Sequence, residues 1–490
     1  MNPTTRRAFR TLAWVIFLFG APTLLAYAWG YRAPSLGPRE SLVPQGPSVG
    51  ALVIRTTPRG ARALLDGRVV DERTPAGISG IPHGMHLVRI EKPGYRTYEK
   101  RVEVRGGQVT DLLHVRLIPD VLEEEIVRQG VSGVWVSPDE RWVVLREGST
   151  LDILPRRALP ALSPESSIRD IGGFEALLPR HRPGELVFFW GPNGNAVAVG
   201  LHRVDDVESP ASLPDSLALI DLTNGRLRAM PPRTALVGWN LNGPERVLLL
   251  NGEGVLLGLS AQATKPEEIA TGILAAAIHP RGVLVQRATA ESGEAPFGLL
   301  RNGGEFQPFP PAFPEPASAF QVSPEGTIAG LSKDRTLFLR STEDQTWRAV
   351  AEGVRHFAWS PDGNKLLYQE SVFDVSVVNV SEDRSVLQKL KPEFLLRLSL
   401  PLRNLQWFSD SQQLLYFDQD ILRLLDIDPR GGHRTEDLAS VDRGDALATV
   451  LEDGAIMLVT ARREPSTQPT VSGRTSDVLL RLFLRTADDR

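Results

Sequence analysis

The chain has 490 residues, of which 42% are hydrophobic and 23% charged, and its net charge is −4. This balance gives no electrostatic reason to expect a nucleic-acid surface, because nucleic-acid-binding domains are normally basic. The absence of cysteine excludes disulfides, thiolate metal sites and thiol nucleophiles. The 43 glycines and 38 prolines indicate many turns and few long helices.

The N-terminal stretch 11–31 has the composition of a membrane-spanning helix. It carries no charged side chain over about 20 residues, which is enough to cross a ~30 Å hydrocarbon core. Arg6, Arg7 and Arg10 precede it, so residues 1–10 are expected in the cytoplasm and the rest of the chain outside. The alternative is a signal peptide cleaved after Ala28, because the preceding residues have the small-x-small form of a cleavage site. Both interpretations predict export of the remaining chain.

Residues 32–49 are rich in proline and glycine and are expected to form an extended linker. Residues 50–118 are predicted to form a small β module. Polar and apolar residues alternate at His86–Ile90 and again at Arg101–Val104, which is typical of half-buried antiparallel strands. The length and the glycine and proline punctuation favour a compact β-sandwich.

An ordered set of short motifs runs through this module: Thr57-Pro58-Arg59-Gly60-Ala61, Asp66-Gly67, Thr74-Pro75, Pro82-His83-Gly84-Met85-His86 and Lys92-Pro93-Gly94-Tyr95. In this set the module closely resembles the PEGA domain, with Arg59 in place of the glutamate for which the family is named. The resemblance implies an extracytoplasmic module associated with bacterial cell surfaces and surface layers, without known catalysis.

A turn between two predicted strands recurs through the rest of the chain. Its fullest copy is Trp359-Ser360-Pro361-Asp362-Gly363, in which Ser, Pro and Gly occupy their preferred turn positions. From the first copy to the last there are seven intervals, which average 314/7, or about 45 residues; a four-stranded propeller blade has ~40–50. This period predicts a β-propeller. The copies centre on Asp139, Asn193, Asn242, Arg281, Glu325, Asp362, Asp410 and Asp453.

The full copy resembles the turn of TolB-type, WD40-like propeller repeats, and the resemblance covers roughly residues 120–488. Eight copies favour eight blades, with seven as the main alternative. Residues 122–130 are predicted to be the outer strand of the last blade, closing the ring against the strands around Val478 to Leu484, because closure removes open sheet edges. The predicted fold class is all-β: a transmembrane helix, a PEGA β-sandwich and a β-propeller. This combination looks like membrane-anchored PEGA proteins of bacteria.

No pattern in the sequence predicts a catalytic, cofactor or metal site. His83 and His86 form the only close histidine pair, and no further ligand stands at a suggestive spacing. Asp426-Ile427-Asp428 and Asp66-Gly67 lack the rest of a calcium loop. There is no Gly-x-Ser-x-Gly elbow and no glycine-rich phosphate loop. The tryptophans before the turns are predicted to pack within the blades rather than to stack on a ligand; these are Trp135, Trp190, Trp239, Trp359 and Trp407.

These features favour a membrane-tethered, extracytoplasmic binding or scaffold protein of the bacterial cell envelope, with no enzymatic activity. The expected partners are the lipid bilayer, through residues 11–31, and envelope proteins or cell-surface glycans, through the propeller. The first alternative is an exported hydrolase or lyase with a site at the channel mouth. It requires convergent side chains, whereas His202, His279 and His356 fall in different predicted blades. A weaker alternative is a sensor whose ten N-terminal residues contact a cytoplasmic partner.

Overall fold

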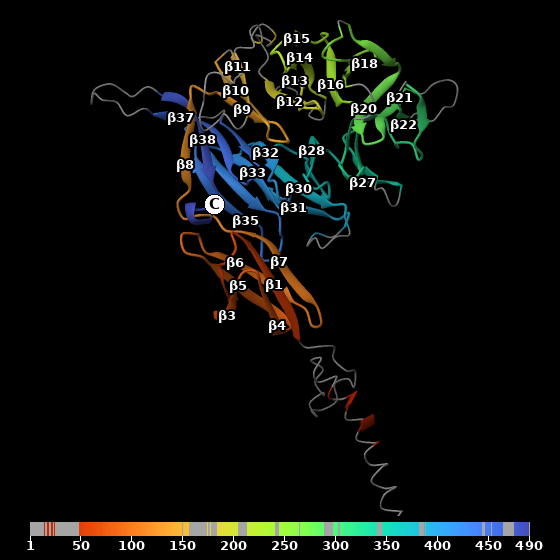
Figure 1. Cartoon of the computed structure of the whole chain (residues 1–490). Helices are drawn as coiled ribbons and strands as arrows, with labels where there is room; N and C mark the ends of the chain where they lie inside the picture. Colours follow the sequence, from red (N-terminus) through yellow and green to blue (C-terminus); the bar gives the residue numbers. More distant parts are fainter. Residues whose placement is uncertain are drawn as a thin grey trace, which may run out of the picture. The chain divides into compact units, whose positions relative to one another are not determined.

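The computed structural model describes most of the chain from Val49 onward, almost entirely as β-strands (Figure 1). The chain divides into two compact units, one of Met1–Glu123, Arg430–Gly432 and Leu484–Arg490, and the other of Glu124–Pro429 and His433–Phe483. The expected all-β class is confirmed for the described residues. These are 49–148, 150–155, 184–203, 213–240, 245–263, 265–288, 297–301, 304–340, 345–381, 389–442, 446–451, 453–463 and 475–489, with Trp14, Phe17, Leu18, Ala21, Pro22, Leu24, Phe174, Leu177 and Leu387.

The expected membrane anchor at residues 11–31 falls mostly outside the described residues, and residues 1–10 and 32–48 lie outside them altogether. Val49, the last residue of the expected linker, is instead the first residue of β1. Within the described part of the chain, no helix combines the length and the apolar character that crossing a bilayer requires. The anchor therefore stays a prediction from the sequence.

The first unit is a sandwich of two sheets around one core. One sheet has the order β4-β1-β7, from β1 (Val49–Thr57), β4 (Ala76–Pro82) and β7 (Val109–Arg116). The other has the order β3-β2-β5-β6, from β2 (Arg62–Leu65), β3 (Arg68–Arg73), β5 (Gly84–Glu91) and β6 (Tyr98–Val104). The alternation predicted from the sequence appears as alternate burial along β6. Leu52 and Ile54 of β1 share one core with Val88, Ile90 and Val102 of the second sheet.

The C-terminal segment of the chain is part of this first unit. Tyr95 is 5% exposed, and its hydroxyl donates to Asp489 Oδ2 at 2.8 Å and accepts from the backbone N of Thr486 at 2.9 Å. Lys92 Nζ lies 3.1 Å from Asp489 Oδ1. The segment ends in the short 3-10 helix η4 (Ala487–Asp489). This assignment differs from the expected propeller boundary at residue 488, because residues from Leu484 onward pack with the sandwich.

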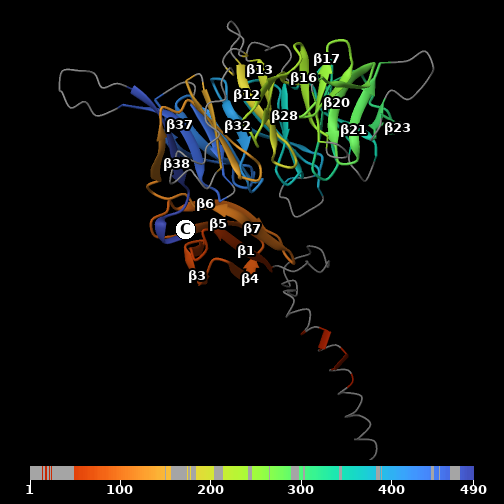
Figure 2. The ribbon, with the colours of Figure 1, turned by 45° about the horizontal axis from the view of Figure 1, so that its top comes forward.

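The second unit consists of antiparallel blades fanned around a common centre, which we number 1 to 8 in chain order (Figure 2). Blades 2 and 3 are joined into one sheet by a single bridge between Asp215 and Ala235. Blade 1 contains β9 (Gly133–Val136), β10 (Trp142–Glu147) and β11 (Thr150–Pro155); blade 2 contains β12 (Gly184–Trp190), β13 (Ala196–Arg203), β14 (Asp215–Asp221) and β15 (Leu227–Ala229). Blade 3 contains β16 (Thr234–Trp239), β17 (Val247–Asn251), β18 (Leu256–Leu259) and β19 (Glu267–Ala270); blade 4 contains β20 (Ile273–His279), β21 (Gly282–Arg287), β22 (Phe297–Leu300) and β23 (Phe306–Pro308).

The remaining four blades each have four strands in the described residues. Blade 5 contains β24 (Ala317–Val322), β25 (Ile328–Ser332), β26 (Leu337–Arg340) and β27 (Trp347–Ala351); blade 6 contains β28 (His356–Trp359), β29 (Lys365–Gln369), β30 (Asp374–Asn379) and β31 (Pro392–Arg397). Blade 7 contains β32 (Arg403–Trp407), β33 (Gln413–Asp418), β34 (Ile421–Asp426) and β35 (Arg434–Ser440); blade 8 contains β36 (Leu447–Val450), β37 (Ile456–Arg463), β38 (Thr475–Phe483) and β8 (Glu123–Gln129).

Blade 8 closes the ring with strands from both ends of the unit. β8 pairs with β38, and Gly130 N donates to Asp477 O at 2.6 Å. The outer strand predicted at residues 122–130 is therefore confirmed. Arg128 of β8 also reaches blade 1, where its Nη2 lies 3.0 Å from Asp152 Oδ2. The described residues thus form eight blades, as the eight turn copies predict.

The repeated turn has the geometry that its residues predict. In the copy at Ser360, the N–H of Gly363 donates to Ser360 O at 2.8 Å, and the N–H of Lys365 donates to Ser360 Oγ at 2.9 Å. The same serine hydroxyl donates to Asp362 Oδ1 at 2.5 Å. The copy at Ser137 repeats this bonding. Each such turn joins the innermost strand of a blade to its second strand.

Candidate functional site

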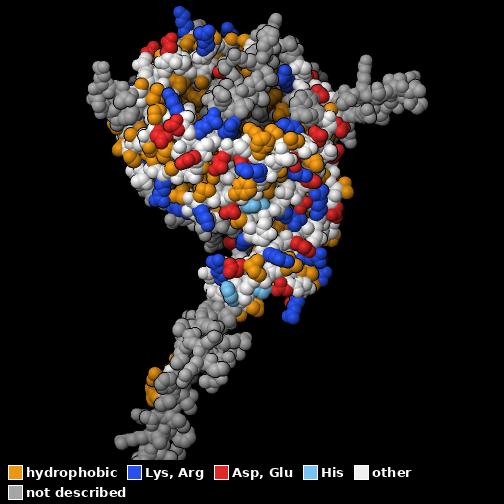
Figure 3. All heavy atoms as spheres, turned by 180° about the vertical axis from the view of Figure 1, so that it is seen from behind, with side chains coloured by type: hydrophobic (Ala, Val, Ile, Leu, Met, Phe, Trp, Pro, Cys, Tyr) orange, Lys and Arg blue, Asp and Glu red, His pale blue; other side chains and the backbone are white. Residues whose placement is uncertain are grey.

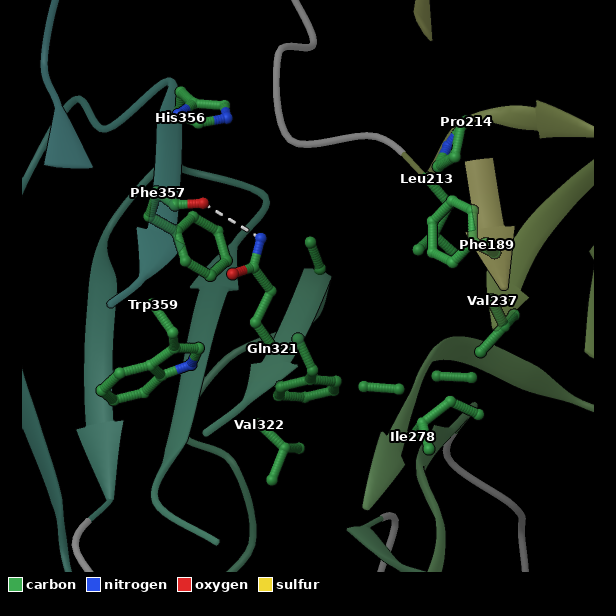
Figure 4. A pocket seen from close by; sticks show the side chains of 14 residues that line it. Phe189, Leu213, Pro214, Val237, Ile278, Gln321, Val322, His356, Phe357 and Trp359 are labelled. Carbon is green, nitrogen blue, oxygen red and sulfur yellow. Dashed lines mark hydrogen bonds between the residues drawn. The ribbon is translucent and has the colours of Figure 1, made fainter. Parts of the chain in front are cut away.

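A cavity of about 320 Å³ lies where the innermost strands of blades 2 to 6 face one another. Figure 4 shows the side chains of β28 along one wall, with those of β12 and β16 across from them. The innermost strands position these groups because each blade presents its first strand to the centre of the ring. The lining residues are Phe189, Leu213, Pro214, Val237, Ala276, Ala277, Ile278, Ala319, Phe320, Gln321, Val322, His356, Phe357 and Trp359.

The hollow arises where alanines replace larger side chains on the innermost strands. Strand β20 contains the run Ala275-Ala276-Ala277, and β24 contributes Ala319. The corresponding positions of blade 7 hold asparagine, leucine and glutamine instead. Sequence reasoning missed this cavity, although the alanine run ahead of the turn at Arg281 was a signal for it.

The side chains that line the cavity are mostly apolar, and none of those described is a carboxylate, lysine or arginine. Its polar side chains are Gln321 and His356. Gln321 Nε2 donates to Phe357 O at 3.0 Å, across the boundary between blades 5 and 6. This bond leaves Gln321 Oε1 as an acceptor at the cavity, because no hydrogen bond to it is made within the described residues. Figure 4 shows Gln321 reaching from β24 towards β28.

Most of the tryptophans singled out in the sequence bind neighbouring blades rather than an open site. Trp239 Nε1 donates to Phe189 O at 2.6 Å, and Trp407 Nε1 donates to Ala358 O at 3.2 Å. Trp135 Nε1 donates to Leu186 O at 3.2 Å. The predicted packing role is confirmed for these three tryptophans, which cross-link adjacent blades.

Trp359 departs from this pattern. It lines the cavity, and its buried Nε1 has no hydrogen-bond partner. The equivalent donor in blade 7, Trp407 Nε1, binds a carbonyl of the preceding blade. A buried N–H without an acceptor is energetically unfavourable, so Trp359 carries an unsatisfied donor behind the cavity wall, whereas Gln321 offers an acceptor on the wall itself.

The histidines considered for a catalytic site do not converge in the described residues. His279 is the last residue of β20, before a turn in which its Nδ1 accepts the N–H of Arg281 at 3.0 Å. Burial, with Arg281 and Arg340 nearby, lowers the pKa of His279 to about 4, so its ring is neutral at pH 7. His279 thus occupies the position of Ser360 in the full copy and supports its turn. His356 lines the cavity, and His202 lies in β13 with its side chain outside the described residues.

The other residues weighed as ligands are held by local structure. His86 Nδ1 lies 2.6 Å from Asp66 Oδ2, and its Nε2 lies 2.8 Å from Pro82 O. Asp66 Oδ1 also accepts the N–H of Leu87, which fixes the turn that contains Asp66. Asp426 Oδ1 accepts the N–H of Asp428 at the end of β34. In the described part of the chain, no three histidine, aspartate or glutamate residues are grouped so that they could hold a metal ion.

A small apolar surface lies at the end of blade 6 opposite the repeated turn. Val372 and Phe373 are each 39% exposed and Leu400 is 48% exposed. Backbone bonds bring the two segments together, because Leu402 N donates to Val372 O and Leu398 N donates to Phe373 O. We call Val372, Phe373 and Leu400 the blade 6 patch.

Comparison with known proteins identifies the first unit. Residues 49–117 match the PEGA domain, which agrees with the motifs recognised in the sequence. No curated protein matches the chain significantly.

Among solved structures, the chain is similar to several proteins described as β-propeller or WD40 domains. It is 10% identical to the β-propeller domain of Cps50 (Swd1) of Myceliophteria thermophila, covering 73% of this chain and 99% of that one, with a TM-score of 0.38. It is 13% identical to the C-terminal WD40 domain of Sif2, covering 73% and 98%, with a TM-score of 0.41. A third similar structure is dihydro-heme d1 dehydrogenase NirN, at 16% identity over 70% and 74%, with a TM-score of 0.45.

Proposed function

We propose that the chain is a non-catalytic binding protein of the bacterial cell envelope. Residues 11–31 hold it in the cytoplasmic membrane, with residues 1–10 inside and the two described units outside. The propeller is a platform for other envelope proteins or for cell-surface glycans. The apolar stretch with its preceding arginines supports the anchor. The PEGA domain supports an extracytoplasmic location, because the family is associated with bacterial cell surfaces.

The blade 6 patch carries the proposal that the platform binds protein. Exposed apolar side chains grouped on a surface mark sites of protein association, and aromatic residues are the usual anchors of such interfaces. Phe373 supplies the aromatic anchor, and Arg397, 66% exposed on the neighbouring β31, supplies a polar rim. A glycan would need several polar groups around the aromatic ring, so the patch favours a protein partner.

Surface charge is consistent with a protein partner. Figure 3 shows acidic and basic side chains interspersed with hydrophobic ones over the face of the propeller that it presents. A mixed surface of this kind gives specificity by local complementarity rather than by a long-range field. A nucleic-acid surface would instead be dominated by lysine and arginine.

The membrane part of the proposal is tested by cell fractionation and protease shaving of intact cells, followed by mass spectrometry of the N-terminus. We expect full-length protein in the membrane fraction, with the propeller cleaved by an external or periplasmic protease. A soluble form that begins at Trp29 would show instead that the N-terminal segment is a signal peptide.

The platform is tested by cross-linking in membranes and capture of the full-length chain. We expect a protein partner that the wild type retains and the double variant Phe373→Ser with Leu400→Ser loses. Val121→Ser is the matched control, because Val121 is 80% exposed and lies outside the blade 6 patch. If the double variant captures the same partner as Val121→Ser, the role of the blade 6 patch is refuted. If only a glycan is captured, the partner is a glycan and not a protein.

A further inference from the structure

We propose that the cavity in the propeller binds a small, neutral, aromatic molecule that carries one hydroxyl group. The site is distinct from the blade 6 patch and does not depend on the platform function. Its walls come from five blades, which a closed ring holds in fixed positions. The class of ligand follows from the volume, the mostly apolar side chains of the lining and the free acceptor of Gln321.

The volume limits the ligand to a small molecule. Ligand sites usually measure about 300–1,000 Å³, so a cavity of 320 Å³ is at the lower end. It has room for about ten waters at ~30 Å³ each. A bicyclic aromatic compound with one substituent fits within this volume.

The lining selects an uncharged, flat molecule. Aromatic rings stand on opposite walls, with Phe189 on β12 and Phe357 and Trp359 on β28 (Figure 4). Such rings favour stacked or edge-on contact with another aromatic ring. The described lining offers no lysine or arginine to pair with an anion and no carboxylate to pair with a cation, and its one ionisable side chain, His356, already interacts with another group. A charged ligand would therefore lose its hydration with little compensation.

The polar groups of the wall select a hydroxyl. Gln321 Oε1 is available as an acceptor because Nε2 of the same amide is committed to Phe357 O. A hydroxyl is a hydrogen-bond donor, so one such group on the ligand can donate to Gln321 Oε1.

The test measures binding of three probes to the full-length chain by equilibrium dialysis. The probes are 2-naphthol, naphthalene and 2-naphthoate, which share a ring system and differ in the polar group. We expect saturable one-to-one binding of 2-naphthol at pH 7. Naphthalene should bind about fivefold more weakly because it lacks the hydrogen bond, and 2-naphthoate should show no saturable binding.

Two variants locate the site. Gln321→Met keeps the length of the side chain and removes the acceptor, so it should abolish the advantage of 2-naphthol over naphthalene. Gln406→Met is the matched control, because Gln406 holds the same position in blade 7, donates to Ala448 O at 2.8 Å and does not line the cavity. Ala277→Leu should fill the cavity and weaken binding of both neutral probes.

The proposal can be decided even if Ala277→Leu fails to fold. The two glutamine variants remove similar hydrogen bonds between blades, so a difference between them in probe binding reflects the cavity. A loss of preference in Gln321→Met, with the wild-type preference retained in Gln406→Met, supports the site. The proposal is wrong if the wild type binds no neutral probe up to its solubility limit. Tighter binding of 2-naphthoate, or equal behaviour of the two glutamine variants, also refutes it.

Discussion

Closure of the propeller ring can be tested at Arg128, which joins blade 8 to blade 1. The Arg128 side chain is 22% exposed, and its partner Asp152 is 10% exposed. Arg128 also contacts Glu147 on β10. Arg128→Met keeps much of the apolar stem and removes the charge. Exposed ion pairs contribute about 0.2–1 kcal/mol, whereas breaking a fully buried pair costs about 3–5 kcal/mol. This partly buried pair lies between these limits, so we expect a loss of about 2 kcal/mol.

Urea unfolding followed by tryptophan fluorescence measures this loss, because the described sandwich contains no tryptophan and every tryptophan from Trp135 onward belongs to the second unit. With a slope of about 2–3 kcal/mol per molar urea, the midpoint should fall by about 0.7–1 M. Arg141→Met is the control, because Arg141 is 60% exposed and pairs with the half-exposed Asp139. Equal midpoints for the two variants would refute the inference that the bridge between blades 8 and 1 stabilises the ring.

Three further predictions concern the sandwich and the turns. Burial lowers the pKa of His86, but the hydrogen bonds of its ring to Asp66 and Pro82 outweigh burial, so the pKa is raised overall. The protonated ring therefore stabilises the fold fully below pH 6.5, and this stabilisation is lost as pH rises through the folded pKa. In an NMR titration, Asp66→Asn should lower that pKa. Tyr95→Phe should destabilise the packing of the C-terminal segment by about 1–2 kcal/mol, seen as faster hydrogen exchange at residues 484–489. Gly363→Ala should cost at least about 1–2 kcal/mol, measured by urea unfolding, because Gly363 has φ of 69°.

Each of these predictions has a result that contradicts it. An unchanged His86 pKa in Asp66→Asn would mean that the carboxylate does not hold the imidazolium. Unchanged exchange at the C-terminal segment would show that the Tyr95 hydroxyl contributes nothing there. Gly353→Ala is the control for Gly363→Ala: Gly353 has φ of 71° with open space around it, whereas a Cβ at Gly363 would lie 2.9 Å from Pro324. Equal costs would refute a steric contribution from the neighbouring turn.

Local chemistry accounts for what could be predicted of the fold. The turn at Ser360 is closed by bonds within six residues, so its residue types alone predict its geometry. Repetition of that turn predicts blades of regular length. The strand at 122–130 could be paired with the C-terminal strands because a propeller without closure leaves two open edges. The sandwich was also predictable from a local pattern, because the alternation of polar and apolar residues along Arg101–Val104 is a property of a single strand.

The tertiary structure decided the features that depend on distant residues. The sequence by itself determined the β-propeller and the PEGA sandwich, because those follow from local turn chemistry and periodicity. It did not determine the cavity, since five separate strands must meet before the alanines of β20 leave a hollow. Nor did it place Asp489 beside Tyr95, because nearly 400 residues separate them and only folding brings a buried hydroxyl to its partner. The neutral state of His279 has the same origin, since burial and two arginines set its pKa.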